Sequence, residues 1–192
     1  MAEIRAFIAV SLPPVLQSQL DLISRQLQEM LPAVPIRWVP VKNIHLTLKF
    51  LGNIPEQTLG ALKESLKAEA SRHPSFEFGL GMPGAFPSIK RPRVIWVGVT
   101  AVEELKELAR GIETQTKSLG FPNEERPFSP HLTLGRVGGQ ATKGDTRLVA
   151  DAVQSLKTEA AGTTRVTEIH LYRSDLNPGG AVYTRLYSAS LM

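Results

Sequence analysis

The same ten-residue pattern occurs twice in this chain of 192 residues, and this duplication constrains the fold more than any other feature. Residues 43–52 read NIHLTLKFLG, and residues 129–138 read SPHLTLGRVG. Each copy contains His-Leu-Thr-Leu, beginning at His45 and at His131. A chance Leu-Thr-Leu follows a given histidine on the order of once in a thousand cases. We therefore interpret the two copies as a duplicated structural unit.

The segments around the two copies also correspond. Each half begins with a strand-like apolar run, followed by an apolar stripe at helical spacing, the motif, a second helical stripe and a further strand-like run. We predict strands over 5–10, 45–48, 76–80, 93–99, 131–134 and 166–172, with helices over 16–30, 59–70, 105–119 and 148–160. The stretch 79–87 is rich in Gly and Pro and is predicted to be a connection.

These patterns predict an α+β fold with a single bilobal catalytic domain over 1–192, built from sequence repeats of approximately 1–88 and 89–192. We expect two lobes related by a pseudo-two-fold axis, with mainly antiparallel sheets flanking a central cleft and the helices outside. A chain of this length can bury about 70% of its unfolded surface, so it needs no covalent or metal staple.

The composition is that of an ordinary globular protein, with 42% hydrophobic and 21% charged residues. Cysteine is absent, which excludes disulfides, a thiolate nucleophile and Cys-ligated zinc. The first residues are too charged for a signal peptide, and no apolar run approaches about 18 residues. We therefore expect a cytoplasmic monomer that does not engage membranes. A formal net charge of +4 is compatible with an anionic partner such as RNA.

Alternation along a strand sends the motif leucines to one face and the His-Thr couples to the other. A two-fold relation would bring His45 and Thr47 to the same cleft as His131 and Thr133. Hydrolysis of a phosphodiester needs a base and an acid, and histidine serves as either because its pKa is about 6.5. Neither a glycine-rich phosphate loop nor paired carboxylates for Mg²⁺ is evident, so we predict catalysis with no metal and no other cofactor.

The paired motifs, the opening RAFIAV, the tails HLTLKFLG and HLTLGR, and the closing LYRSDLNPGGAVY resemble the two-histidine (2H) phosphoesterase superfamily. Within it, they closely resemble the RNA 2′,3′-cyclic phosphodiesterase branch, also called RNA 2′–5′ ligase. The resemblance implies that the chain opens RNA 2′,3′-cyclic phosphate ends to 2′-phosphomonoesters, with His45 as proton donor and His131 as proton acceptor. It implies a nucleotide contact for Phe50 and phosphate contacts for three residues: Thr47, Thr133 and Arg136.

Simple alternation, however, puts Phe50 and Arg136 on the leucine face, away from the histidines. Either the strands bulge or end after the second leucine, or these two residues lie outside the site. Gly135 favours a break in the second motif strand, and hence a site role for Arg136. For Phe50, a core position and a site position are equally compatible with the sequence.

Three other residues carry expectations from the sequence alone. Lys49, which flanks the first motif, is a candidate for steering an RNA backbone. Trp96 is expected in the core. His170 is expected on a solvated strand face, with a position lining the cleft as the alternative.

Three alternative functions stay open from the sequence. The first is an RNA 2′–5′ ligase that joins a cyclic phosphate end to a 5′-hydroxyl. The second is a phosphodiesterase for small metabolites. The third is a non-catalytic RNA-binding module, which would bind RNA without turning it over.

Overall fold

The structure is a computed structural model that describes residues 2–156, 163–178 and 180–192. Its helices are α1 (Pro14–Met30), α2 (Leu59–Ala70), α3 (Val102–Ser118) and α4 (Lys143–Ser155), with short 3₁₀ turns η1 (Val41–Asn43) and η2 (Glu56–Thr58). Its strands are β1 (Glu3–Val10), β2 (Ile36–Trp38), β3 (Leu46–Pro55), β4 (Phe76–Phe78), β5 (Leu80–Ser88), β6 (Arg91–Val99), β7 (His131–Val137), β8 (Thr164–Val166), β9 (Glu168–Asn177) and β10 (Gly180–Ser190). Residues 157–160 of the helix predicted over 148–160 lie outside the described residues.

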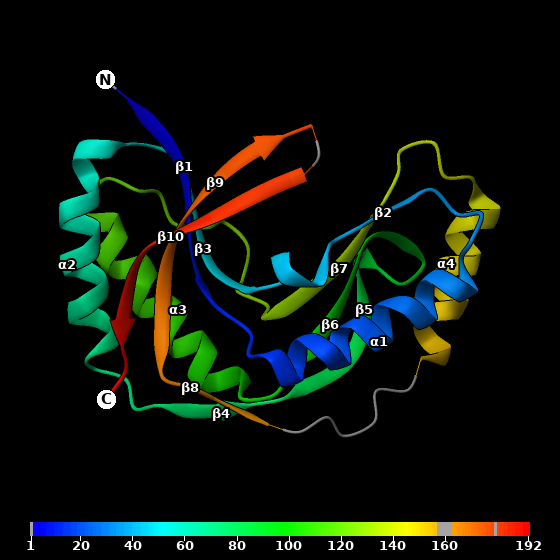
Figure 1. Cartoon of the computed structure of the whole chain (residues 1–192), viewed down its shortest axis with the longest axis horizontal. Coiled ribbons are helices and arrows are strands. Elements are labelled where there is room, and N and C mark those ends of the chain that lie inside the picture. Colours follow the sequence, from blue (N-terminus) through cyan, green and yellow to red (C-terminus); the bar gives the residue numbers. More distant parts are fainter. Residues whose placement is uncertain (1, 157–162, 179) are drawn as a thin grey trace.

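The strands form two four-stranded sheets and one short ribbon, and the α+β fold predicted from the sequence is confirmed. The first sheet has the order β10-β9-β1-β3, the second has the order β2-β7-β6-β5, and β4 pairs with β8. The strand pairs among the described residues are all antiparallel. Figure 1 shows the two sheets side by side, with α2 and α3 outside the first sheet and α1 and α4 beside the second.

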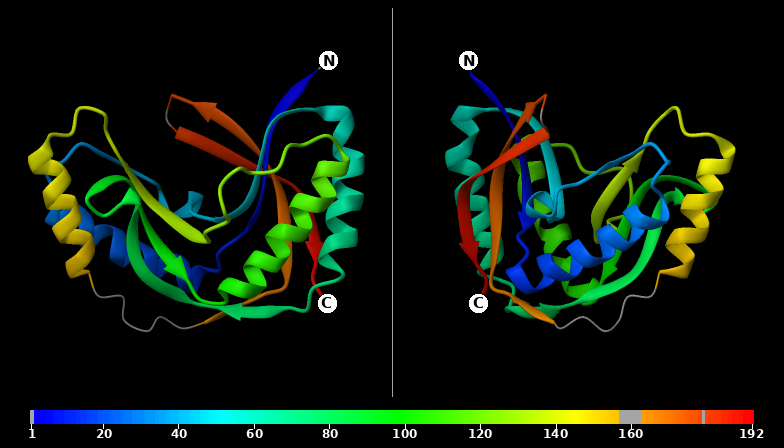
Figure 2. Two further views of the ribbon diagram at one scale, coloured as in Figure 1. Left: turned by 180° about the vertical axis from the view of Figure 1, so that it is seen from behind. Right: turned by 45° about the vertical axis from the view of Figure 1, so that its right-hand side comes forward.

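Each sheet takes strands from both halves of the sequence. The first sheet joins β1 and β3 to β9 and β10, and the second joins β2 and β5 to β6 and β7. The helices cross over in the same way, because α2 packs against α3 and α1 contacts α4 (Figure 2). One cluster of buried apolar side chains includes residues of both four-stranded sheets and of the four helices. The two halves are therefore interlocked, while the single-domain organisation with repeats 1–88 and 89–192 stays a prediction.

The stretch predicted to be a connection at 79–87 is instead an edge strand, β5. An edge strand tolerates proline because one row of its N–H groups faces away from the ladder. Pro83 and Pro87 occupy such an edge, and Gly84 leaves the space that the Trp96 ring of β6 fills. The turn residues that suggested a loop are thus what an edge strand beside a large aromatic ring requires. No helix in the described part of the chain is long and apolar enough to cross a membrane.

The interface between α2 and α3 generates a stability prediction at Gly111. A Cβ at Gly111 would overlap the carboxylate of Glu69, which is nearly buried and accepts hydrogen bonds from His73 Nε2 (2.8 Å) and Gln115 Nε2 (3.3 Å). Overpacking usually costs about 1–3 kcal/mol, and the helix propensity of alanine offsets about 1 kcal/mol of it, so Gly111→Ala should lower the free energy of unfolding by up to about 2 kcal/mol. Gly60 in α2 has open space around it, so the control Gly60→Ala should raise that free energy by up to about 1 kcal/mol. Urea denaturation compares the two variants, and equal stabilities would contradict a fixed Glu69.

Candidate functional site

The first motif strand, β3, contains a β-bulge at the second leucine of its motif. Thr47 and Lys49 face consecutive residues of β1, so Leu48 between them is the extra residue. A bulge shifts the alternation of side chains by one position. Phe50 consequently lies on the same face as Thr47, and its side chain is 53% exposed.

The second motif strand, β7, bulges at the corresponding leucine. Thr133 and Gly135 face consecutive residues of β6, so Leu134 is the extra residue. Arg136 is therefore exposed on the face of Thr133, while Leu134 stays fully buried.

The two bulges decide between the alternatives that the sequence left open. The break after the second leucine is present in both strands, not only in the strand that contains Gly135. The interpretation of Phe50 as a core aromatic is wrong, because half of its surface is exposed. The structure thus brings each His-Thr couple onto one face with the residue five positions after its histidine.

Both motif histidines are oriented by the same hydrogen bond. Nδ1 of His45 lies 2.9 Å from the carbonyl oxygen of Asn43, and Nδ1 of His131 lies 2.7 Å from that of Ser129. A carbonyl oxygen only accepts, so Nδ1 is the donor in each ring. The neutral form of each ring then carries its lone pair on Nε2, which is the nitrogen that can take or give a proton.

Aromatic rings from three strands surround His45. Phe7 of β1 stacks on it with ring centroids 4.6 Å apart, and Tyr183 of β10 meets it edge-on at 5.1 Å. Tyr172 of β9 stacks in turn on Phe7 at 5.3 Å. These rings hold the imidazole in place and remove water from its sides.

A second set of aromatic rings surrounds His131. Phe86 of β5 meets it edge-on at 4.9 Å, and the Trp96 ring centroid lies 6.1 Å away. The sequence interpretation of Trp96 as a core residue is wrong. Its neighbours Ile95 and Val97 are fully buried on the core side, whereas Trp96 pairs with Thr133 on the face of the histidine.

Burial lowers the pKa of both histidines. Desolvation is the largest cause in each ring, and the hydrogen bonds to Asn43 and Ser129 act in the opposite direction. The positive charge of Arg136 further lowers the pKa of His131. The two rings therefore share a scaffold but differ in their electrostatic surroundings.

Arg136 also connects the two sheets electrostatically. Burial raises the pKa of Tyr183, and the guanidinium groups of Arg136 and Arg5 act against that rise. Arg136 lies in the second sheet, whereas Tyr183 packs against His45 in the first. The strands β3 and β7 also contact each other directly. The charge of Arg136 thus lowers the pKa of His131 and also that of Tyr183, whose ring packs against His45.

Two further residues differ from their sequence-based interpretations. His170 is buried on the face of the first sheet, where its ring nitrogens lie 3.0 Å from Ser11 Oγ and 2.9 Å from Ser188 Oγ. The solvated position expected for His170 is therefore wrong. Lys49 is also buried, and its ammonium group binds Glu113, so the expectation that it steers RNA is wrong.

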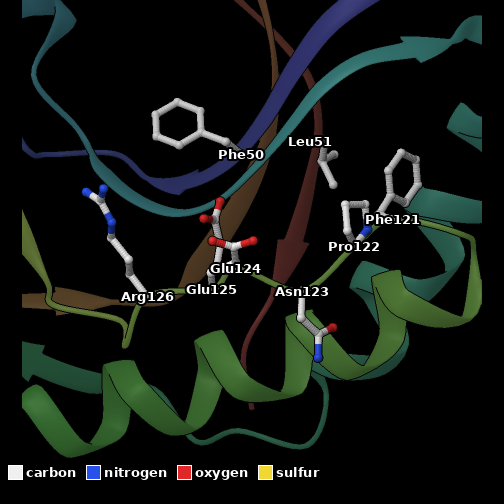
Figure 3. A pocket seen from close by; sticks show the side chains of 8 residues that line it. All are labelled: Phe50, Leu51, Phe121, Pro122, Asn123, Glu124, Glu125 and Arg126. Carbon is white, nitrogen blue, oxygen red and sulfur yellow. The ribbon is translucent and has the colours of Figure 1, made fainter.

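A pocket of about 410 Å³ lies beside Phe50. Figure 3 shows β3 forming one side with Phe50 and Leu51, and the chain after α3 forming the other with Phe121, Pro122, Asn123, Glu124, Glu125 and Arg126. Its apolar and charged walls could accept a flat ring with polar edges. Among the residues that the structure describes, no group of three or more His, Asp and Glu side chains could hold a metal ion.

Comparison with known proteins points to one family. The family model of the 2′-5′ RNA ligase superfamily matches residues 13–178. The RNA 2′,3′-cyclic phosphodiesterase of Archaeoglobus fulgidus is 34% identical over 95% of this chain and 97% of its own length. TT0787 of Thermus thermophilus has a TM-score of 0.78 at 28% identity, covering 97% of each chain. Escherichia coli LigT complexed with 3′-AMP has a TM-score of 0.73 at 28% identity, covering 100% of this chain and 99% of its own.

The site predicts how the two histidines titrate. Their pKa values should lie below about 6.5 in the folded protein, and their neutral rings should carry the proton on Nδ1. Below about pH 6.5 the histidines of the unfolded chain bind protons more readily than those of the folded protein. The free energy of unfolding should therefore fall as the pH is lowered from about 6.5 toward the pKa values of the folded protein. A ¹H–¹⁵N NMR titration of the imidazole groups measures both properties. Neutral rings protonated on Nε2 would contradict the orienting bonds.

Proposed function

Because the chain belongs to the 2′-5′ RNA ligase superfamily, we propose that it hydrolyses RNA 2′,3′-cyclic phosphate ends to 2′-phosphomonoesters without a metal ion. The observation that carries this proposal is the pair of identically oriented histidines, each with Nε2 available for proton transfer. A relative named RNA 2′,3′-cyclic phosphodiesterase is similar over nearly the whole chain, which supports the same substrate class.

In the proposed reaction, a water oxygen attacks phosphorus while its proton passes to Nε2 of His131. The bond between phosphorus and the 3′ oxygen breaks, and that oxygen takes a proton from Nε2 of His45. The products are a 2′-phosphomonoester and a 3′-hydroxyl, and the proton that His131 gains replaces the one that His45 loses. Acid and base on opposite sides of phosphorus suit an in-line displacement.

The charge of Arg136 supports the role of His131 as the base. Arg136 favours the neutral, proton-accepting form of His131. The pKa of His45 is set instead by burial and by the opposing bond to Asn43. The negative charge of a bound phosphodiester would favour the protonated form of both rings and so would offset the effect of burial on His45, the proposed donor.

The remaining candidate residues have roles that follow from their position. Thr47 and Thr133, each half-buried on the face of its histidine, can donate hydroxyl hydrogen bonds to the non-bridging phosphate oxygens. Arg136 can balance the charge that develops there. The exposed ring of Phe50 can stack on a nucleobase at the mouth of its pocket.

Ligation is the second candidate, and the description of the family favours it. It uses the same groups, with a 5′-hydroxyl in place of the attacking water. Water at about 55 M competes with any such acceptor, so we expect hydrolysis to dominate. Product analysis with a 5′-hydroxyl oligonucleotide separates the two reactions. The monomeric state and cytoplasmic location expected from the sequence stay predictions.

The first test is substitution of the two histidines. His45→Ala and His131→Ala should each lower kcat for a 2′,3′-cyclic nucleotide by about 10²–10⁴-fold, because each removes one proton-transfer group. His73→Ala is a matched control, since His73 bonds Glu69 at the end of α2. Turnover is measured with EDTA present. Full activity in either site variant, or loss of parent activity in EDTA, would contradict the proposal, whereas RNA binding without turnover would favour a binding module.

A second test uses the charge of Arg136. The pH dependence of kcat/KM should be bell-shaped, with an acidic limb set by the base His131. Arg136→Gln should move that limb to higher pH, because loss of the positive charge raises the pKa of His131. KM should also rise, since Arg136 is proposed to bind the phosphate. A limb that stays in place, or moves to lower pH, would argue against His131 as the base.

A further inference from the structure

Lys49 lies four residues after His45, on the opposite face of β3 from Phe50, and its side chain is only 1% exposed. A buried ammonium group is costly unless it is paired and hydrogen-bonded. A lysine at this position therefore needs partners that the fold supplies on that side of the sheet.

The partners of Lys49 belong to the region that leads into the second motif. Its Nζ lies 2.6 Å from Glu113 Oε2 of α3 and donates to the carbonyl oxygen of Pro122 at 2.8 Å. The same carboxylate oxygen accepts a hydrogen bond from the backbone N–H of Glu124 at 3.4 Å. The buried Lys49 and the partly exposed Glu113 thus bind two backbone groups of the segment 119–130, which connects α3 to β7.

The segment 119–130 contributes to the site in two ways. Its far end contains Ser129, whose carbonyl oxygen orients His131. Its middle forms one wall of the pocket that faces Phe50 (Figure 3). Phe121 and Phe128 pack partly against the core at either side of the tethered stretch. The Lys49–Glu113 pair therefore connects the first motif strand to the orientation of the second histidine.

We propose that Lys49 is a positioning residue, which fixes the segment 119–130 so that Ser129 holds His131 in its productive orientation. The expected effect on kinetics rests on the proposed function. The tether, by which we mean the bonds of Lys49 and Glu113 to Pro122 and Glu124, does not depend on the substrate. The tether acts on the base at one motif from a residue within the other, so it couples the two repeats.

The kinetic test compares Lys49→Met with Lys106→Met. Lys106 is a matched control, because it forms an exposed ion pair with Glu103 on the same helix, α3, and has no bond to the segment. Lys49→Met should lower kcat roughly ten- to a hundredfold, as displacement of a catalytic group does. KM should rise by a smaller factor, because the released segment also forms one wall of the pocket beside Phe50. Lys106→Met should leave both parameters unchanged. Equal kinetics in the two variants would overturn the proposal.

A spectroscopic test separates this proposal from the proposed function. The Nδ1–H proton of His131, protected by its bond to Ser129, should exchange faster with water in Lys49→Met and not in Lys106→Met, as measured by ¹H–¹⁵N NMR. Unchanged exchange would overturn the positioning role, whether or not the parent turns over cyclic phosphates. A parent without turnover but with faster exchange in Lys49→Met would contradict the proposed function and leave the tether supported.

A second variant guards against a folding defect. Glu113 is 20% exposed, and Glu113→Gln keeps the size of the side chain while it removes the charge that pairs with Lys49. Because this leaves a buried ammonium group without its counter-charge, urea denaturation must first show that the variant is folded under the conditions of the exchange measurement. Glu113→Gln should reproduce the faster exchange of the His131 proton in weaker form, because the amide oxygen can still accept a hydrogen bond. Exchange as slow as in the parent would overturn the proposal.

Discussion

The arrangement of the candidate site depends on an extra residue at the second leucine of each motif, although β3 has a further irregularity at Leu51. In a regular strand, every second side chain returns to the same face. The bulges at Leu48 and Leu134 keep both motif leucines in the core and then reverse the alternation. The face that presents the histidine and the threonine consequently also presents Phe50 or Arg136. Without the bulges, these side chains would point into the apolar layer.

The surroundings of the two imidazoles balance opposing requirements. The aromatic rings around His45 and His131 fix the imidazoles and exclude water, which lowers their pKa values. A carbonyl bond at Nδ1 partly offsets that effect and selects the tautomer. The same contacts thus determine the orientation and the protonation of each ring. A group that transfers protons needs a fixed orientation and a pKa near the working pH, and here the same contacts influence both.

Much of the architecture could be predicted from local patterns, and the failures share a physical cause. The motif strands, the helices and the faces of the His-Thr couples follow from periodicities of two and about 3.6. Other features depend instead on bulges or on partners distant in the sequence. A bulge exposes Phe50, pairing with β6 makes β5 a strand, and Glu113 of α3 allows Lys49 to be buried. The position of Trp96 depends on space left by Gly84 in a neighbouring strand. Such long-range pairings leave no local periodicity. The one available signal was the equal spacing from each histidine to Phe50 and to Arg136.

The equivalence of the two repeats explains how a duplicated chain can build an asymmetric site. The interlocked sheets give both motifs the same backbone, including the bulge and the orienting carbonyl. Position five after the histidine is then exposed in both, and it is an aromatic ring in one repeat and a cation in the other. The cation lowers the pKa of His131, whereas burial lowers the pKa of both rings. Divergence at this pair of equivalent positions therefore gives two similarly held histidines different electrostatic surroundings.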